Sequence, residues 1–328
     1  LEARRTFEQS ARAVIRLNEK EEKGKRVFFV MTPTGRRLRA NAHVTIRHHW
    51  QTGEQIEIEI NNRGFRGPAI GPKTGKRLLF LGDSITLAAY QREENTFVRR
   101  IEQLAHGDGR DWETVNAGVA GTSLKNSLSI LVETGLSTEP DVVVLGFYLN
   151  DFLDSYGVYV EQPPEWLEGS RLASYIYKAL SARQPEPEID YAAFHPDQDA
   201  INNLDPAKIK IDQQTYFDTL KAIKADMYYA EHHRVSDWQE DFFAQLQQRP
   251  LDKEQRKFYQ QVLDHFRDWG GTWSPHAWTY MRPVFEELKK LSVAHGFKLL
   301  IVCFPVRPQV EAKARFDDPQ RHLEDVAK

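Results

Sequence analysis

The sequence predicts an α/β fold in which one parallel β-sheet lies between two layers of helices. Two observations lead to this prediction. From residue 76 onward, segments typical of strands alternate with segments typical of helices. The strand segments are continuous apolar runs, such as DVVVLGFYL at residues 141–149, and such runs are typical of strands covered on both faces. Together they indicate a parallel sheet with crossover helices.

Residues 1–72 are predicted to be an N-terminal extension with a small β unit. Near-helical spacing of apolar residues predicts an amphipathic helix over residues 3–22. Stretches typical of strands follow at residues 27–32, 36–49 and 55–60, and a turn cluster occupies residues 61–68. We interpret the basic run from Gly35 to Arg39 as a solvated strand edge.

Residues 73–151 are predicted to form the first part of the α/β domain. We expect strands at residues 77–81, 113–116 and 141–149, with helices at residues 95–105 and 122–136. The alternation breaks over residues 152–272, which are polar, rich in aromatic residues and mostly helical in pattern. We interpret this stretch, with its Pro-rich connection at residues 184–187, as an insertion over one end of the sheet.

Residues 273–328 are predicted to continue the α/β domain. A helix is expected over residues 276–295, a strand over residues 298–306, and a further helix from His322. We expect a final strand beyond Lys328, which would complete the sheet.

The composition narrows the class of protein. The 328 residues are 41% hydrophobic and 28% charged, as in globular proteins with a sizeable core. A net charge of -3 argues against nucleic acid as a partner. The single cysteine, Cys303, allows no intramolecular disulfide and is expected to be a small buried hydrophobe. No window resembles a membrane span or signal peptide, but the chain begins at Leu1, so an upstream signal or membrane anchor stays open.

Small and polar residues directly follow three of the predicted strands. They are GDSIT at residues 82–86, NAGVAGT at residues 116–122, and the pair Asn150-Asp151. The carboxyl ends of parallel strands meet at one edge of a sheet, so we expect these loops to converge. Each piece has an ordinary alternative, because Gly-Asp-Ser and glycine occur in turns and Asn-Asp can cap a helix. All three in order, each after an apolar strand, favour a functional site.

These pieces resemble the motifs of the SGNH hydrolase family, also called GDSL esterases and lipases. The resemblance is close over residues 76–151 and looser over residues 276–306. It implies a three-layer, flavodoxin-like fold. It also implies three site residues, which are the nucleophile Ser84 in GDSIT, the block-two glycine Gly121 in NAGVAGTS, and the block-three asparagine Asn150 in YLND.

The chain departs from the family pattern at one position beside this site. The family usually has glycine two places before the block-three asparagine, and here Tyr148 stands there. We expect Tyr148 to narrow the pocket beside Asn150. The stretch NRGFRGP at residues 62–68 also resembles a bacterial subgroup whose members are commonly exported, which favours a periplasmic or extracellular location.

The chemistry of ester hydrolysis agrees with this resemblance. A serine hydroxyl is a weak nucleophile until a neighbouring base takes its proton. Its attack on an ester puts negative charge on the carbonyl oxygen, which then needs hydrogen-bond donors about 2.7–3.1 Å away. The resemblance implies that the N–H groups of Ser84 and Gly121 and the side-chain amide of Asn150 are these donors. We assign Asp83 and Asp151 to hydrogen bonding within their loops.

The resemblance also implies an Asp-x-x-His motif near the C-terminus, which would supply the base. None of the 11 histidines has an aspartate three positions before it. The nearest approach is DPQRH, from Asp318 to His322, which is one residue too long and lies where a helix is expected to begin. We therefore expect the motif beyond Lys328.

Other residue patterns give weaker signals. Adjacent side chains point apart on a strand or helix, so we interpret His48-His49 and His232-His233 as solvated and not as metal ligands. With neither a Gly-rich phosphate loop nor a spaced cysteine motif in the sequence, we expect no cofactor and no metal. The aromatic stretches 238–243 and 269–278 fit a sugar-stacking wall, although the core of the insertion is favoured.

The sequence therefore predicts a serine ester hydrolase that acts on a small-molecule or polysaccharide acyl ester through an acyl-Ser84 intermediate. Removal of acetyl groups from a carbohydrate is the favoured reaction, as the resemblance to the subgroup implies. Two alternatives stay open. One is an O-acyltransferase that uses the same site, and the other is a catalytically silent glycan-binding module of the same fold. The sequence leaves the oligomeric state open.

Overall fold

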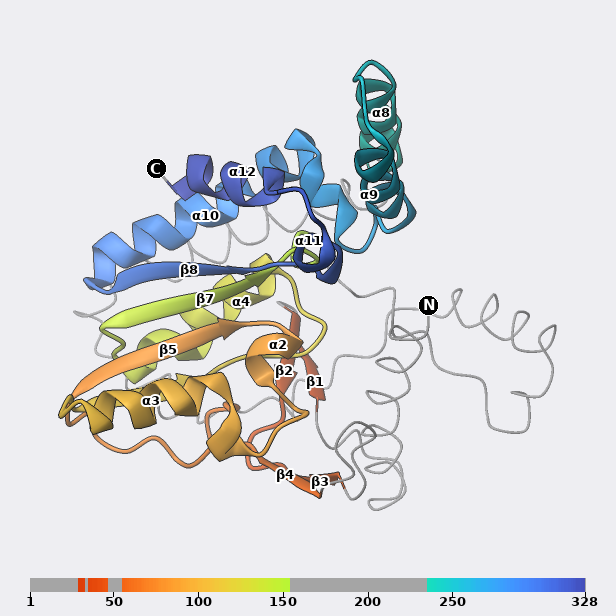
Figure 1. The fold of residues 1–328 in the computed structure, drawn as a ribbon. Coiled ribbons are helices and arrows are strands. Elements are labelled where there is room, and N and C mark those ends of the chain that lie inside the picture. The colour runs from red at the N-terminus through yellow and green to blue at the C-terminus, as the bar shows by residue number, and fades with distance from the viewer. Residues whose placement is uncertain (1–28, 33–34, 47–54, 154–234, 328) are drawn as a thin grey trace, which may run out of the picture.

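The computed structural model describes residues 29–32, 35–46, 55–153 and 235–327 (Figure 1). The predicted helix over residues 3–22, the Pro-rich connection and the pairs His48-His49 and His232-His233 lie outside the described residues.

A four-stranded parallel sheet forms the centre of the fold, in the order β6-β5-β7-β8. Its strands are β5 (Lys76–Gly82), β6 (Trp112–Asn116), β7 (Val142–Tyr148) and β8 (Lys298–Phe304). In the middle of the sheet, Leu79 of β5 lies opposite Val115 of β6 and Val143 of β7. The predicted strands are confirmed to within a few residues.

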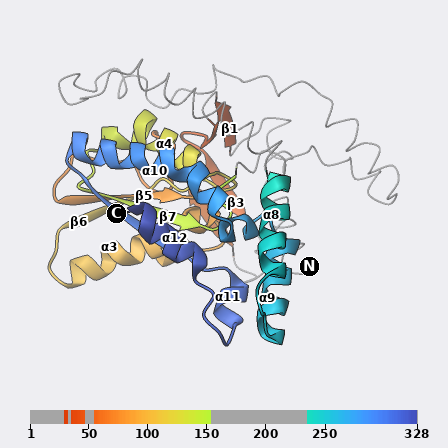
Figure 2. The same cartoon turned by 90° about the horizontal axis from the view of Figure 1, so that it is seen from above.

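Helices cover both faces of this sheet, which gives the predicted three-layer α/β/α fold. Figure 2 shows the strands between α3 (Phe97–Gly107) on one side and α4 (Leu124–Ile130) with α10 (Pro275–His295) on the other. Alternate residues of β5 divide between the two faces. Leu78 and Phe80 pack in the cluster that includes Val98 of α3, whereas Leu79 and Leu81 belong to the larger core on the α4 and α10 side.

The N-terminal unit consists of two antiparallel hairpins. Strand β1 (Phe29–Thr32) pairs with β2 (Gly35–Leu38), and β3 (His43–Ile46) pairs with β4 (Ile56–Glu59). The single strand expected over residues 36–49 is therefore wrong, because a turn at Asn41, which has a φ of 59°, separates β2 from β3.

The expectation that the basic run of β2 is solvated is also wrong. Arg36 and Arg37 are both buried. Arg36 donates to the carbonyl of Ala120 at 3.0 Å, and Arg37 forms an ion pair with Glu133 at 2.6 Å. These arginines attach the N-terminal unit to the α/β domain, because each finds an acceptor far away in the sequence.

Two helix boundaries differ from the sequence prediction. The helix expected over residues 122–136 is α-helical only as α4, and a π-helical turn (Leu131–Gly135) and a 3₁₀ turn (Leu136–Thr138) continue it. The last helix, α12 (Asp318–Ala327), begins four residues before the predicted His322.

Helices from the end of the predicted insertion lie beside the N-terminus of α10 (Figures 1 and 2). They are α8 (Val235–Gln247) and α9 (Lys253–Asp264), and a 3₁₀ turn (Gly270–Trp273) leads into α10. The tryptophans of α8, of the 3₁₀ turn and the residue before it, and of the start of α10 are buried, namely Trp238, Trp269, Trp273 and Trp278. These tryptophans thus belong to the core of this region and do not form an open sugar-stacking wall. Among the described helices, none has the length and apolar character needed to cross a membrane.

Candidate active site

The candidate site lies at the carboxyl edge of the sheet, where the strand order reverses. The chain leaves β5 through α3 on one face to reach β6, then returns through α4 on the other face to β7, on the opposite side of β5. Connections that leave neighbouring strands toward opposite faces open a crevice at the strand ends, and ligands of open α/β sheets bind there. Ser84 follows β5 and Asn150 follows β7, so both lie at this reversal.

Ser84 is the first residue of a one-turn helix, α2 (Ser84–Leu87), directly after β5. The Asp83 carboxylate begins this helix, because its Oδ1 accepts a hydrogen bond from the N–H of Ile85 at 2.8 Å. The half-buried Ser84 directs its Oγ toward Oδ2 of Asp83 at 3.4 Å, a long hydrogen bond. The serine is therefore held at its backbone, while its hydroxyl is only weakly bound.

The loop after β6 is bonded to the loop that carries Ser84. The N–H of Val119 donates to the carbonyl of Gly82 at 2.9 Å. The side chain of Asn116 donates to the carbonyl of Thr86 at 2.9 Å and accepts from the N–H of Gly118 at 3.0 Å. Asn116 thus connects β6, its loop and α2, a role that the sequence did not reveal.

Backbones approach closely at Gly118. A Cβ at this position would lie 2.3 Å from the backbone nitrogen of Leu87, so no side chain fits between this loop and α2. Gly121, three residues further on, is half-buried and has a φ of 70°, a conformation that glycine adopts at little cost.

Asn150 lies in the turn after β7 and is half-buried. The next residue, Asp151, accepts a hydrogen bond at its backbone carbonyl from the N–H of Leu124, at the start of α4, at 2.8 Å. This bond joins the third loop to the segment that follows Gly121. The three predicted site residues therefore come from loops that are bonded in sequence, the first to the second and the second to the third.

Asp83 and Asp151 form a buried pair of carboxyl groups behind these loops. Each makes the hydrogen bond expected of it, Asp83 with the N–H of Ile85 and Asp151 with the N–H of Tyr148 at 2.9 Å. Burial raises the pKa of Asp83 to about 6. Burial, together with the nearby charge of Asp83, raises the pKa of Asp151 well above its ordinary value.

Sequence reasoning missed this pair, since each aspartate is an ordinary loop residue in its own segment. One signal was present, because both follow strands that end at the same edge of the sheet. Tyr148 belongs to the same electrostatic environment. Burial and the charges of Asp268, Asp83 and Asp151 raise the pKa of its phenol to about 12, so the group stays neutral.

In the described residues, no histidine is hydrogen-bonded to Ser84. His322 stacks on the ring of Trp278, with ring centroids 5.8 Å apart, while Asp318 pairs with Arg321. Another His–Asp pair, His276 with Asp241 at 3.3 Å, is largely exposed. Within the described residues, neither His322 nor His276 is hydrogen-bonded to the three loops.

The described part of the chain gathers no group of three or more His, Cys, Asp or Glu side chains that could hold a metal ion. Cys303, expected to be buried, is half-buried against the core, and burial raises the pKa of its thiol to about 11, so the thiol is neutral.

Comparisons with known proteins give little further support. No family model matches the chain, and no curated protein matches it. Among solved structures, one titled "Crystal Structure of TesA" is similar to this chain at 20% identity, over 40% of this chain and 72% of that chain, with a TM-score of 0.23. A similarity this weak supports no conclusion about activity. The described sheet and helices themselves show the α/β/α fold.

Proposed function

We propose that the protein is a serine ester hydrolase of the SGNH type, with Ser84 as its nucleophile. The observation that carries the proposal is the set of hydrogen bonds that joins the loops of Ser84, Gly121 and Asn150 at the reversal of strand order. Three neighbouring loops at the edge of the sheet thereby carry the hydroxyl of Ser84, the backbone N–H of Gly121 and the side-chain amide of Asn150.

The reaction proceeds in two steps. The Oγ of Ser84 attacks the ester carbonyl while a base takes its proton, and collapse of the tetrahedral intermediate expels the alcohol, which receives that proton. Water then attacks the acyl-Ser84 ester, with the same base acting again, and releases the carboxylic acid. The N–H groups of Ser84 and Gly121 and the side-chain amide of Asn150 stabilise the negative oxygen in both steps. The Asp-x-x-His motif that the resemblance implies would supply the base.

The substrate class that we propose is a short acyl ester, with acetyl groups on a carbohydrate as the favoured case. The half-buried Tyr148, two residues before Asn150 where the family has glycine, supports a small acyl group, because its side chain would take up space beside Asn150. The carbohydrate part depends on the resemblance to the exported subgroup. The buried tryptophans of the α8 to α10 region add nothing to it.

The test is hydrolysis of p-nitrophenyl acetate by the purified full-length protein. We expect Ser84→Ala to abolish activity and Ser236→Ala, an exposed serine on α8, to leave it unchanged. Equal rates for Ser84→Ala and the unmodified protein would exclude Ser84 as the nucleophile. The same assay with added oligosaccharide separates hydrolysis from acyl transfer, since transfer forms an acylated sugar in place of free acid.

A further inference from the structure

Arg66 is a buried arginine from the turn cluster, outside the predicted α/β domain. Only 3% of its surface is exposed. Its backbone pairs with the end of β6, because the N–H of Arg66 donates to the carbonyl of Asn116 at 3.0 Å, and it also forms a bridge with Ile60. The backbone of Arg66 is therefore fixed between the N-terminal unit and the sheet.

The guanidinium of Arg66 binds the C-terminal end of α2. Nη1 donates to the carbonyls of Leu87 and Ala88, each at 2.6 Å, and Nη2 donates to the carbonyl of Gln91 at 2.6 Å. The last carbonyls of a helix have no donor within the helix. One side chain thus binds two carbonyls at the end of the helix that begins with Ser84 and a third, that of Gln91, in the turn that follows. We call this set of bonds the Arg66–α2 contact.

Helix α2 depends on such contacts because it is a single turn. A four-residue helix is not stable by itself. It ends at Ala88, which has a φ of 51°, a left-handed conformation that is unfavourable for a residue with a Cβ. The N–H of Ala88 donates to the carbonyl of Ser84 at 2.9 Å, so this end of the turn is bonded directly to the serine. Whatever fixes Ala88 also fixes the backbone of Ser84.

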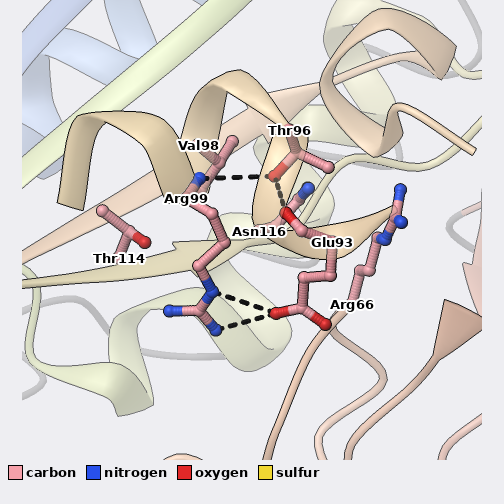
Figure 3. Close-up of a pocket in the computed structure, with 7 residues that line it drawn as sticks. All are labelled: Arg66, Glu93, Thr96, Val98, Arg99, Thr114 and Asn116. Carbon is pink, nitrogen blue, oxygen red and sulfur yellow. Dashed lines mark hydrogen bonds and ion pairs between the residues drawn. The ribbon is translucent and has the colours of Figure 1, made fainter. Parts of the chain in front are cut away.

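The charge of Arg66 suits this position. A cation is favourable at a helix C-terminus, where the carbonyl dipoles point. Burial lowers the pKa of Arg66 to about 10, with Glu93 and Glu94 acting in the opposite direction, so the group stays charged at neutral pH. Figure 3 shows that Glu93 pairs with Arg99, while the guanidinium of Arg66 points away from that pair. The Arg66 guanidinium therefore donates its hydrogen bonds to backbone carbonyls and not to a carboxylate.

We propose that Arg66 is a positioning residue for Ser84, which acts through the Arg66–α2 contact to hold the nucleophile's backbone at the crevice. The inference rests on the proposed function. Lysine cannot replace it, since a single ammonium lacks the planar fork that reaches three carbonyls. We expect substitution of Arg66 to lower kcat and to leave KM nearly unchanged, because in this proposal Arg66 positions Ser84 and does not contact the substrate.

The test compares Arg66→Lys and Arg66→Ala with Arg77→Lys as the matched control. Arg77 is also buried and donates to the carbonyls of Thr138 and Gly71, but it lies at the opposite end of β5. All variants are assayed on p-nitrophenyl acetate in the full-length protein, at a temperature where circular dichroism shows them folded. We expect Arg66→Lys to lower kcat at least about tenfold at similar KM, and guanidinium ion to restore part of the activity of Arg66→Ala.

Amide hydrogen exchange provides a readout that does not depend on activity. We expect the amides of Leu87 and Ala88, which donate within α2, to exchange at least roughly tenfold faster in both Arg66 variants and unchanged in Arg77→Lys. Unchanged exchange at these amides, or the same loss of kcat in Arg77→Lys as in Arg66→Lys, would overturn the inference. Faster exchange in a protein whose hydrolysis does not need Ser84 would instead overturn the proposed function and leave the Arg66–α2 contact standing.

Discussion

Charged residues are buried at both ends of the central strand β5. They are paired with opposite charges at the amino end, whereas two carboxyl groups lie near each other at the carboxyl end. At the amino end, Arg77 forms an ion pair with Glu113 at 2.5 Å, and Asp141 accepts from the N–H of Arg77 at 2.8 Å and pairs with Lys73 at 2.7 Å. Burial acts to raise the pKa of Glu113, but hydrogen bonds from Thr74 and Arg77 outweigh it and hold the pKa at about 2.

At the carboxyl end, the buried Asp83 and Asp151 interact electrostatically, and neither forms an ion pair with a described residue. Their pKa values are raised, and Oδ1 of Asp151 is buried without a hydrogen-bond partner in the described residues. The amino end thus stabilises the sheet, whereas the carboxyl end keeps an unfavourable charge pair beside the candidate site. Such locally unfavourable arrangements are typical of functional sites. Mutations at the two ends should therefore differ in their effects on the free energy of unfolding and on kcat.

The largest effect is expected for Asn150→Ala at the carboxyl end. Removal of one oxyanion donor typically costs about 2.7–4 kcal/mol of transition-state stabilisation, or roughly 10²–10³ in kcat. We expect kcat for p-nitrophenyl acetate to fall by that factor, while the free energy of unfolding changes by less than about 0.5 kcal/mol. An Asn150→Ala protein with unchanged kcat would remove Asn150 from the site.

The next largest effect is expected for Arg77→Met at the amino end. This change removes the ion-pair partner of Glu113, which keeps its hydrogen bonds from Thr74, and the donor to the carbonyls of Thr138 and Gly71, so the free energy of unfolding should fall by roughly 3 kcal/mol. Urea unfolding measures the loss. The rate constant per folded molecule should not change, and a loss of kcat comparable with that of Asn150→Ala would contradict the division between the two ends.

A smaller effect, which depends on pH, is expected for Asp151→Asn. Burial and the charge of Asp83 raise the folded pKa of Asp151 well above its ordinary value, so the folded state holds more protons than the unfolded state, and stability falls as pH rises from that ordinary value through the folded pKa. Asparagine can still accept from the N–H of Tyr148, and it removes the like charge. We expect Asp151→Asn to be more stable than the unmodified protein at pH 8, by about 1 kcal/mol, with a flatter pH profile.

The matched control for this pH profile is Asp141→Asn at the amino end. Although burial acts to raise the pKa of Asp141, the side chain of Lys73 and the N–H of Arg77 lower it overall. A lowered pKa adds stability above the unfolded value, and that stability is lost as pH falls. Asp141→Asn should therefore destabilise at pH 8 and have less effect in acid. The same sign of change for both variants at pH 8 would show that the two ends are electrostatically alike.

The smallest effect is expected for Lys73→Ala, also at the amino end. The ion pair of Lys73 with Asp141 is partly exposed, and such pairs typically contribute about 0.2–1 kcal/mol. Thermal unfolding at low and at high salt measures the change, which should shrink as salt screens the pair. A larger loss, unaffected by salt, would mean that the lysine stem contributes by packing.

The sequence was sufficient for the sheet and for the order of the site loops, because those depend on local patterns. The run from Leu78 to Leu81 in β5 and most of β7 are apolar, so their burial on both faces could be read directly. The loops that contain Ser84, Gly121 and Asn150 could be placed at one edge, since every parallel strand ends on the same side.

The parts that were missed depend on contacts between distant segments. Arg36, Arg37 and Arg66 are polar by composition, and only the folded chain shows the carbonyls and the carboxylate that bury them. The π-helical turn at residues 131–135 was missed for the same reason. Gly135 packs so closely on Leu79 that a Cβ there would lie 2.8 Å from its side chain.

The absence of any side chain at Gly118 has a consequence for how the crevice can respond to a ligand. With its backbone packed directly on Leu87, the second loop and the serine-bearing turn have no compressible layer between them. A molecule that displaced one of them would have to displace the other by the same amount. A ligand bound at this edge of the sheet should therefore be accommodated by motion of the surrounding segments, while the serine-bearing turn and its neighbouring loop move together.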